Sequence, residues 1–319
     1  MLRPLIKFVP DTTNIDFLRG RWIAIVLSIV LVAGSIALIA TRGLNFGVDF
    51  AGGQQFQATF SQAPQIDRLR DAIGALDVGE PSIQQFGTPR EVAIRLPRPP
   101  AGIDVAAATT RVQQAVRAID PQVRFDAVET VSARVSDELA WDGSLALLLA
   151  MIGIAAYIWV RFEWQFGVGA LVSLVHDLTI VTGFYAATQI EVGLNVVAAL
   201  LTLIGYSLND TVVVYDRIRE NLRRYRKMEI EPLLNLSVNE TLSRTIATNG
   251  AVLLAVLALV IFGPDTIYSL TIGILVGVIV GTYSSIYVAR FVLVPLGVGP
   301  DSFLPRDAAG SAERVAPRK

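Results

Sequence analysis

The chain has 319 residues but no cysteine and only one histidine. Without cysteine it cannot form a disulfide bond or a thiolate metal site, and a single histidine cannot build a multi-histidine metal centre. We therefore expect no metal, no cofactor and no redox chemistry.

Long apolar runs, by contrast, are abundant. Hydrophobic residues make up 53% of the chain and the mean hydropathy is positive, above the level of ordinary soluble domains. Runs near the roughly 17 to 25 residues that cross a bilayer lie at 22–40, 143–160, 166–188, 192–214, 245–262 and 268–292. The first exceeds the apolar core of a signal peptide, about 7 to 15 residues, and lacks a good cleavage site, so we expect a retained anchor.

Basic residues in the short connections predict the orientation. The connections at 189–191 and 263–265 contain no lysine or arginine. Basic residues gather instead in segment 1–21, at Arg161, in segment 215–244 (between Arg217 and Arg244), and from Arg290 into the tail 293–319. Because basic residues mark cytoplasmic connections, we expect both termini in the cytoplasm and segment 41–142 on the opposite side of the membrane.

Segment 41–142 has the pattern of one small α+β domain. We expect strands at 54–60, 82–86, 91–96 and 123–128, with helices at 65–76 and after Pro99-Pro100. This βαββαβ order is typical of a ferredoxin-like fold. The domain has no catalytic signature and its charges nearly balance, so we expect neither an enzyme nor a nucleic-acid-binding protein.

A short amphipathic helix is expected between this domain and the second apolar run. Val131, Val135 and Leu139 recur every four residues and would share one helical face. Such a helix either couples the domain to the membrane part or lies as a linker on the lipid surface.

Polar residues interrupt the apolar runs. They are His176 and Asp177 in the middle of the third run, Asn209 and Asp210 in the cytoplasmic half of the fourth, and Arg244 and Asn249 at the start of the fifth. An ionisable side chain at bilayer depth costs at least about 2.5 kcal/mol on insertion scales. Asp210 and Arg244 reach similar depths on neighbouring spans, so they could form a pair. That pair either serves transport or is a static bridge between helices.

Small residues recur along the sixth run. Gly273, Gly277 and Gly281 are spaced four residues apart and predict a smooth stripe on which another helix packs closely. The hydroxyl run 282–285 follows, and it would line a polar interior or bond to a neighbouring helix.

Four segments together resemble a known family. They are Gly47-Val48-Asp49-Phe50-Ala51-Gly52-Gly53, the stretch 205–211 running into 216–221, the stretch 239–245, and the glycine stripe of the sixth run. In their order, spacing and six-span plan they resemble the SecF family of the bacterial Sec protein-export machinery, within the wider RND superfamily. The resemblance covers nearly the whole chain.

The resemblance implies a polytopic α-helical protein of the bacterial inner membrane, with a half-RND-like bundle of six helices and a periplasmic ferredoxin-like domain. It implies SecD as partner, with SecYEG and YajC as further candidates, and preproteins and protons as what is moved. Asp210 and Arg244, with Asn209, would belong to the proton path. Asp49 would shape a turn or cap a connection, and His176 and Asp177 have no assigned role.

Two other functions stay open at this point. A half-size RND-type exporter of lipids or small molecules would share the six-span plan and the buried acid, but it should need a continuous substrate cavity. A non-transporting scaffold subunit would use its polar pairs only to hold helices together, and it should tolerate a neutral residue in place of Asp210.

Overall fold

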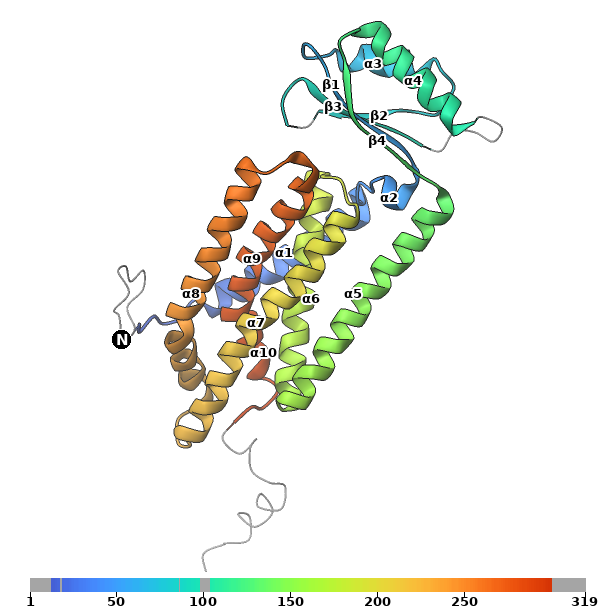
Figure 1. Ribbon diagram of the computed structural model, residues 1–319. Helices are drawn as coiled ribbons and strands as arrows, with labels where there is room; N and C mark the ends of the chain where they lie inside the picture. Colours follow the sequence, from blue (N-terminus) through green and yellow to red (C-terminus); the bar gives the residue numbers. More distant parts are fainter. Residues whose placement is uncertain (1–12, 18, 86, 98–103, 300–319) are drawn as a thin grey trace, which may run out of the picture.

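The computed structural model describes residues 13–17, 19–85, 87–97 and 104–299. They form a long helical bundle with a small α/β domain at one end (Figure 1). Six helices of this part are long and apolar enough to cross a membrane, as the sequence predicted. They are α1 (Arg21–Arg42), α5 (Ala133–Arg161), α6 (Trp164–Thr188), α7 (Leu194–Arg224), α8 (Ile230–Phe262) and the unit Asp265–Leu293, which comprises η1 (Asp265–Ile267), α9 (Tyr268–Ile286) and α10 (Val288–Leu293).

Helices α6, α7 and α9 form the centre of the bundle. The apolar stretch of α6 is 56% buried, whereas that of α1 is 11% and that of α5 is 6% buried. The glycine stripe of α9 allows this packing, because Gly277 lies against Leu203 and Gly281 against Ser207, both on α7. Helix α9 thus approaches α7 closely along the stripe.

The segment 215–244, expected as a loop, is mostly helical. Helices α7 and α8 continue beyond the apolar runs and leave only a short break between Arg224 and Ile230. Apolar residues such as Ile218 on α7 and Leu234 on α8 bury in one shared core. Glu240 joins the two extensions by accepting hydrogen bonds from Arg217 Nε at 2.8 Å and from Asn221 Nδ2 at 2.6 Å.

The helix expected at 129–139 is not a separate element. Strand β4 (Arg124–Val131) runs to Val131, and Ser132 then caps the beginning of α5 by accepting a hydrogen bond from Val135 N at 3.4 Å. Helix α5 continues without a break to Arg161. The last strand of the domain therefore leads directly into a membrane-spanning helix.

The α/β domain has the predicted element order. Strands β1 (Gly53–Thr59), β2 (Ser82–Gln85), β3 (Glu91–Leu96) and β4 form an antiparallel sheet in the order β2-β3-β1-β4, and the helices are α3 (Ile66–Gly74) and α4 (Val105–Ile119). Both helices cover the sheet face turned away from the bundle (Figure 1), over a core that includes Phe56, Leu69, Ile94 and Val112. This arrangement is compatible with a ferredoxin-like fold.

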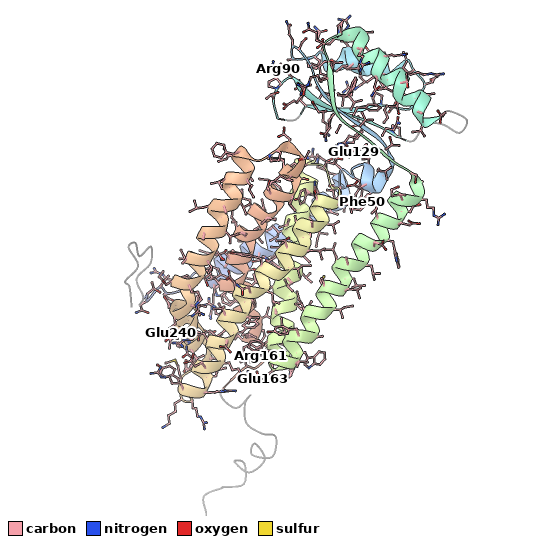
Figure 2. All side chains as sticks on the ribbon, in the orientation of Figure 1. Phe50, Arg90, Glu129, Arg161, Glu163 and Glu240 are labelled. Atoms are coloured by element: carbon pink, nitrogen blue, oxygen red, sulfur yellow. The ribbon has the colours of Figure 1, made fainter. Side chains whose placement is uncertain are left out.

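Charged residues mark the two ends of the molecule. Figure 2 labels Arg90 and Glu129 in the α/β domain, Phe50 at its junction with the bundle, and Glu240, Arg161 and Glu163 toward the opposite end. Phe50 belongs to the short helix α2 (Val48–Ala51), which lies between α1 and the sheet. Arg161 and Glu163 flank the sharp connection between α5 and α6.

Candidate functional site

Asp210 lies in a polar cluster that joins three helices. Its side chain on α7 is only 4% exposed and accepts a hydrogen bond of 2.5 Å from Asn249 Nδ2 on α8. The same amide nitrogen lies 2.6 Å from Thr282 Oγ1 on α9. The Tyr206 hydroxyl donates to Asn249 Oδ1 at 2.5 Å. Asn249 therefore links the carboxylate to both neighbouring helices.

The helical spacing explains how these residues meet. Tyr206 and Asp210 are four residues apart and so lie on one face of α7. Thr282 directly follows Gly281, where α9 comes so close that an added Cβ would lie 3.3 Å from Ser207 Cβ. The small residue thus brings the Thr282 hydroxyl to the level of the Asp210 cluster.

The expected pair of Asp210 and Arg244 does not form in the structure. Thr245 and Asn249, four residues apart on α8, are buried at 2% and 5% exposure and face the bundle. Arg244 is one residue earlier and is therefore rotated about 100° around the helix; its side chain is exposed. The sequence predicted that the Arg244 cation would contact Asp210, but the side-chain amide of Asn249 takes that place in the structure.

Asn209 also lies outside the Asp210 cluster. It is exposed on α7, as is Gly205 one turn earlier. The structure therefore separates the three residues that the resemblance placed in one proton path: Asp210 faces inward, whereas Asn209 and Arg244 face outward.

A second polar cluster surrounds Asp177 in the middle of α6. Asp177 is fully buried, and its Oδ2 accepts hydrogen bonds from Ser207 Oγ on α7 at 2.6 Å and from Ser284 Oγ on α9 at 2.7 Å. His176 Nδ1 lies 2.9 Å from Asp177 Oδ1. The His176 ring stacks on Tyr283, whose hydroxyl donates to the Ala24 carbonyl of α1 at 2.6 Å.

The two clusters are neighbours along α7. Ser207 of the second cluster and Asp210 of the first are three residues apart, about one helical turn. Polar groups thus cross the centre of the bundle from α1 to α8, through α6, α7 and α9. The sequence indicated the hydroxyl run 282–285 and Asn249, but it did not identify Tyr206 or Ser207 as partners.

The motif 47–53 forms the junction between the bundle and the α/β domain. Asp49 Oδ2 accepts a hydrogen bond from Leu194 N at 2.8 Å, which caps the beginning of α7 as expected for this residue. Gly52 and Gly53 have φ angles of 68° and 117°, a backbone region that favours glycine. At Gly47, a Cβ would collide with the Glu191 carboxylate. The backbone of the motif therefore requires glycine at Gly52 and Gly53, whereas a side chain at Gly47 would require the Glu191 carboxylate to shift.

An ion pair that sequence reasoning missed closes the same junction. Arg95 of β3 binds Glu191, in the α6–α7 connection, at 2.9 Å, and donates to Asn45 Oδ1 at 3.0 Å. Burial raises the pKa of Glu191, an effect that Arg95 opposes and that the negative charges of Asp49 and Glu129 reinforce. Both partners lie in segments with no membrane or motif signal, so only the folded structure identifies them.

The motif residue Asn239 holds the beginning of the described chain. Its Oδ1 accepts a hydrogen bond from Ile15 N at 2.8 Å, and its Nδ2 donates to the Ile15 carbonyl at 2.9 Å. Asn235, one turn earlier on α8, accepts from Phe17 N at 3.0 Å. The stretch 239–245 therefore anchors the segment that precedes α1.

Comparisons with known proteins agree with this architecture. The model of the SecD/SecF GG motif matches residues 37–64, and that of the C-terminal part of the protein export membrane proteins SecD/SecF matches residues 111–298. The protein translocase subunit SecF of Cereibacter sphaeroides is 42% identical over 300 residues, which cover 92% of this chain and 93% of that protein. The SecF subunit of Calditerrivibrio nitroreducens is 43% identical over 288 residues, covering 89% and 94%.

Solved structures give the same relationship. The crystal structure of SecDF from Thermus thermophilus, a translocon-associated membrane protein, is 31% identical with a TM-score of 0.83. The match covers 92% of this chain but 40% of that one, so the chain spans about two fifths of the SecDF length. SecDF in its super-membrane-facing form matches with a TM-score of 0.68 at 30% identity, covering 98% and 41%. The chain therefore belongs to the SecD/SecF family of protein-export membrane proteins, among its SecF members.

Proposed function

We propose that this chain is a protein translocase subunit that acts with a SecD subunit to complete the transfer of preproteins across the inner membrane. Protonation and deprotonation of Asp210 would couple this work to the proton gradient. The observation that carries the proposal is the buried carboxylate of Asp210, which Asn249 links to α8 and α9.

The chemistry of the Asp210 cluster supports proton coupling. A carboxylate inside a membrane-spanning bundle is costly when charged, and a neutral amide offsets only part of that cost. A bound proton removes the charge and also removes the need for the Asn249 donor. The contact between α7 and α8 can therefore differ between the two states. A proton crossing a potential of 100 mV releases about 2.3 kcal/mol, enough to shift such an equilibrium more than tenfold.

The outward-facing residues support a partner subunit. Asn209 on α7 and Arg244 on α8 are exposed within helices long enough to cross a membrane. A guanidinium at membrane depth requires a polar or acidic partner. In this proposal the SecD subunit covers this face and brings an acceptor to Arg244, and the pair contacts SecYEG, with YajC as a further candidate.

The orientation belongs to the same proposal. Both termini and the helical extensions within 215–244 would lie in the cytoplasm, and segment 41–142 in the periplasm, where it would contact the emerging preprotein. The Arg95–Glu191 ion pair and the direct passage from β4 into α5 are among the links that join this domain to the bundle. A shift of α6 against α7 would thereby move the domain.

A charge-neutral substitution tests the proposal. Asp210→Asn should insert and assemble with SecD, because the amide keeps the size of the side chain, yet lose the gradient-dependent late step of preprotein export in inner-membrane vesicles. Asp216→Asn on the same helix is the matched control, since Asp216 is 62% exposed and pairs loosely with Arg161 at 3.6 Å. It should export like the wild type.

Two results would contradict the proposal. Export by Asp210→Asn at the wild-type rate under a gradient would show that no proton at this position drives the work. Loss of both assembly and export in Asp210→Asn, with recovery of both when Arg244→Gln is added, would show a static bridge formed in the complex. The kinship with translocase subunits favours the proposed function over a half-size exporter.

A further inference from the structure

Arg290 is a buried cation without a hydrogen-bond partner. The residue lies on α10 and is 0% exposed, and Nε, Nη1 and Nη2 of its guanidinium all lack a partner in the described structure. A buried guanidinium left unpaired is among the most unfavourable features that a fold can carry. Its N–H groups need an acceptor that the described residues do not supply.

Among the described residues, the acids nearest to Arg290 do not fill this role. Asp16 and Glu231 are near enough to act on Arg290 electrostatically. Glu231, however, binds Arg21 at 2.6 Å, and Asp16 accepts a hydrogen bond from Arg19 N at 3.2 Å. The close contacts of Arg290 are instead aromatic, because its guanidinium carbon lies 5.0 Å from the ring centroid of Phe291 and 5.9 Å from that of Tyr287. These rings do not satisfy its N–H groups with hydrogen bonds to charged oxygen atoms, as a phosphate would.

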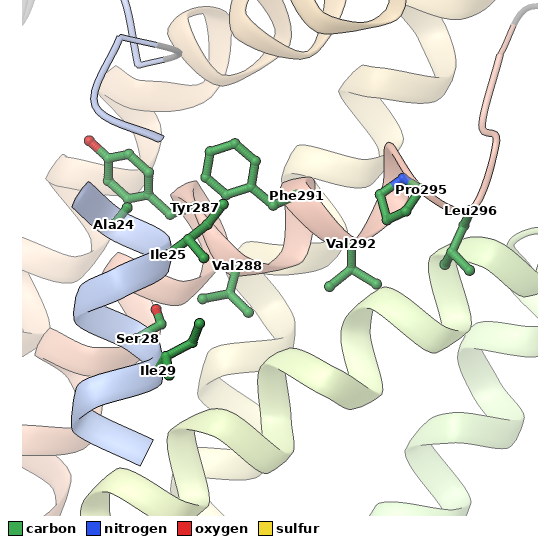
Figure 3. Close-up of a pocket in the computed structure, with 10 residues that line it drawn as sticks. All are labelled: Ala24, Ile25, Ser28, Ile29, Tyr287, Val288, Phe291, Val292, Pro295 and Leu296. Atoms are coloured by element: carbon green, nitrogen blue, oxygen red, sulfur yellow. The ribbon is translucent and has the colours of Figure 1, made fainter. Parts of the chain in front are cut away.

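An apolar groove begins at the same two rings. It lies between α1 and the end of the chain's last membrane-spanning unit, has a volume of about 310 Å³, and is shown in Figure 3. Its lining is Ala24, Ile25, Ser28 and Ile29 of α1 with Tyr287, Val288, Phe291, Val292, Pro295 and Leu296. The groove is thus an apolar groove on a membrane-spanning surface, and the two rings that Arg290 contacts, Tyr287 and Phe291, belong to its lining.

The surroundings of the groove match the headgroup region of a membrane. Arg19 and Arg21 lie at the beginning of α1, just before the groove residues Ala24 and Ile25. Trp22 beside them is 66% exposed, as is typical of a side chain at the membrane interface. This end of the groove therefore carries charged side chains, with Arg21 paired to Glu231, whereas its interior is apolar.

We propose that an anionic phospholipid binds here, with one acyl chain in the groove between α1 and α10 and its phosphate on Arg290. The guanidinium presents N–H groups in a fork that fits two phosphate oxygens. Because Arg290 is covered in the unliganded chain, the rings of Tyr287 and Phe291 turn aside as the phosphate enters. The phosphate of the lipid thus supplies the missing negative charge, and its acyl chain fills the groove.

Lipid binding by the purified full-length chain tests this site. Native mass spectrometry would compare adducts with phosphatidylglycerol, which is anionic, and phosphatidylcholine, which is zwitterionic. The wild type should prefer phosphatidylglycerol. Arg290→Gln should lose that preference, and Ile25→Trp, which fills the groove, should lose the bound lipid. Arg224→Gln is the matched control, because Arg224 is an exposed arginine that also lies on a tyrosine ring, 5.2 Å from Tyr225; it should keep the preference.

Thermal unfolding in nanodiscs separates lipid binding from a purely structural role. Phosphatidylglycerol should raise the unfolding temperature of the wild type above its value in phosphatidylcholine. Arg290→Gln should fold in phosphatidylcholine at least as stably as the wild type and gain nothing from phosphatidylglycerol. The proposal is overturned if the wild type shows no headgroup preference, if Arg290→Gln retains it, or if Arg290→Gln fails to fold in either lipid. None of these readouts depends on proton coupling.

Discussion

The two buried aspartates of the bundle have different surroundings, which give them different roles. Asp177 has three side-chain contacts, to His176, Ser207 and Ser284. Asp210 has one described donor, the Asn249 amide. Asp177 therefore ties α6 to both α7 and α9 through its side-chain contacts. Asp210 has fewer bonds of this kind, and in the proposed function it is the group that exchanges a proton.

The tie at Asp177 predicts a specific loss of stability. Ser284→Ala removes one hydrogen bond to the carboxylate and should lower the free energy of unfolding by about 1 to 2 kcal/mol. Ser285→Ala is the control, since Ser285 is equally buried but bonds only the Thr282 carbonyl of its own helix. Unfolding in detergent would measure both. Equal losses in the two variants would show that the Asp177 contact contributes nothing specific.

At this scale the sequence predicts which residues are buried but not which partners they meet. Because a charge in a membrane is costly, Asp177 and Asp210 were singled out from the sequence, and both are buried in the structure. The partner of Asp210 was wrong, because Arg244 and Asn249 are five residues apart on α8 and face different directions. Choosing between them requires the rotation of α8 against α7, which Thr245 and neighbouring buried residues determine by packing.

At the scale of elements, the glycine stripe controls how α9 meets α7. A Cβ on Gly277 would lie 2.8 Å from Leu203 Cδ1, so Gly277→Ala requires Leu203 to move and should destabilise the protein by about 1 to 3 kcal/mol. Gly250→Ala on α8 meets nothing within 4 Å and should be neutral or slightly stabilising. Thermal unfolding of the two variants would check this, and an equally mild effect at Gly277 would contradict close packing there.

Hydropathy predicted the number of spans well but not the ends of the helices. Six spans were expected and six helices have the required length. The length of an apolar run reflects the thickness of the lipid. Helices α7 and α8 are longer than their apolar runs because their extensions pack against each other. Ile218 and Leu234 extend the core beyond the apolar runs. The many charged residues of segment 215–244 mask the helical spacing of such apolar residues in the sequence. The domain order, by contrast, followed directly from its alternating strands.

At the scale of the whole molecule, several contacts connect the α/β domain and its preceding segment to the α6–α7 connection of the bundle. Residues Phe46 and Val192 form a backbone bridge, Asp49 caps α7, and Arg95 pairs with Glu191. Each contact joins the domain side to the α6–α7 connection. In the proposed function, movement within the bundle core would reach the domain through this connection.

The raised pKa of Glu191 predicts how the junction responds to pH. Burial disfavours the charged carboxylate more than Arg95 favours it, so the closed junction seen in the structure, here called docked, favours protonated Glu191 relative to a junction in which Glu191 is exposed to water. Docking should strengthen as the pH falls through this raised pKa and weaken as the pH rises above it. The effect should begin above the ordinary glutamate value of about 4.3.

Spin labels would measure this response in a chain that has no cysteine of its own. Labels at Thr110→Cys in α4 and Thr188→Cys at the end of α6 report the distance between domain and bundle by double electron–electron resonance. The distribution of distances between the two labels should narrow on acidification in the wild type. In Glu191→Gln the same distribution should be narrow at every pH. A junction that opens on acidification would reverse the predicted sign.

The most direct test of proton coupling is to observe the proton on Asp210. Infrared difference spectroscopy of the SecD complex in lipid, recorded between neutral and acidic pH, detects the C=O stretch of a protonated carboxyl group. A band that appears on acidification should be missing in Asp210→Asn and present in Asp216→Asn. If Asp210→Asn leaves every pH-dependent carboxyl band of the wild type in place, Asp210 does not change protonation and the account is contradicted.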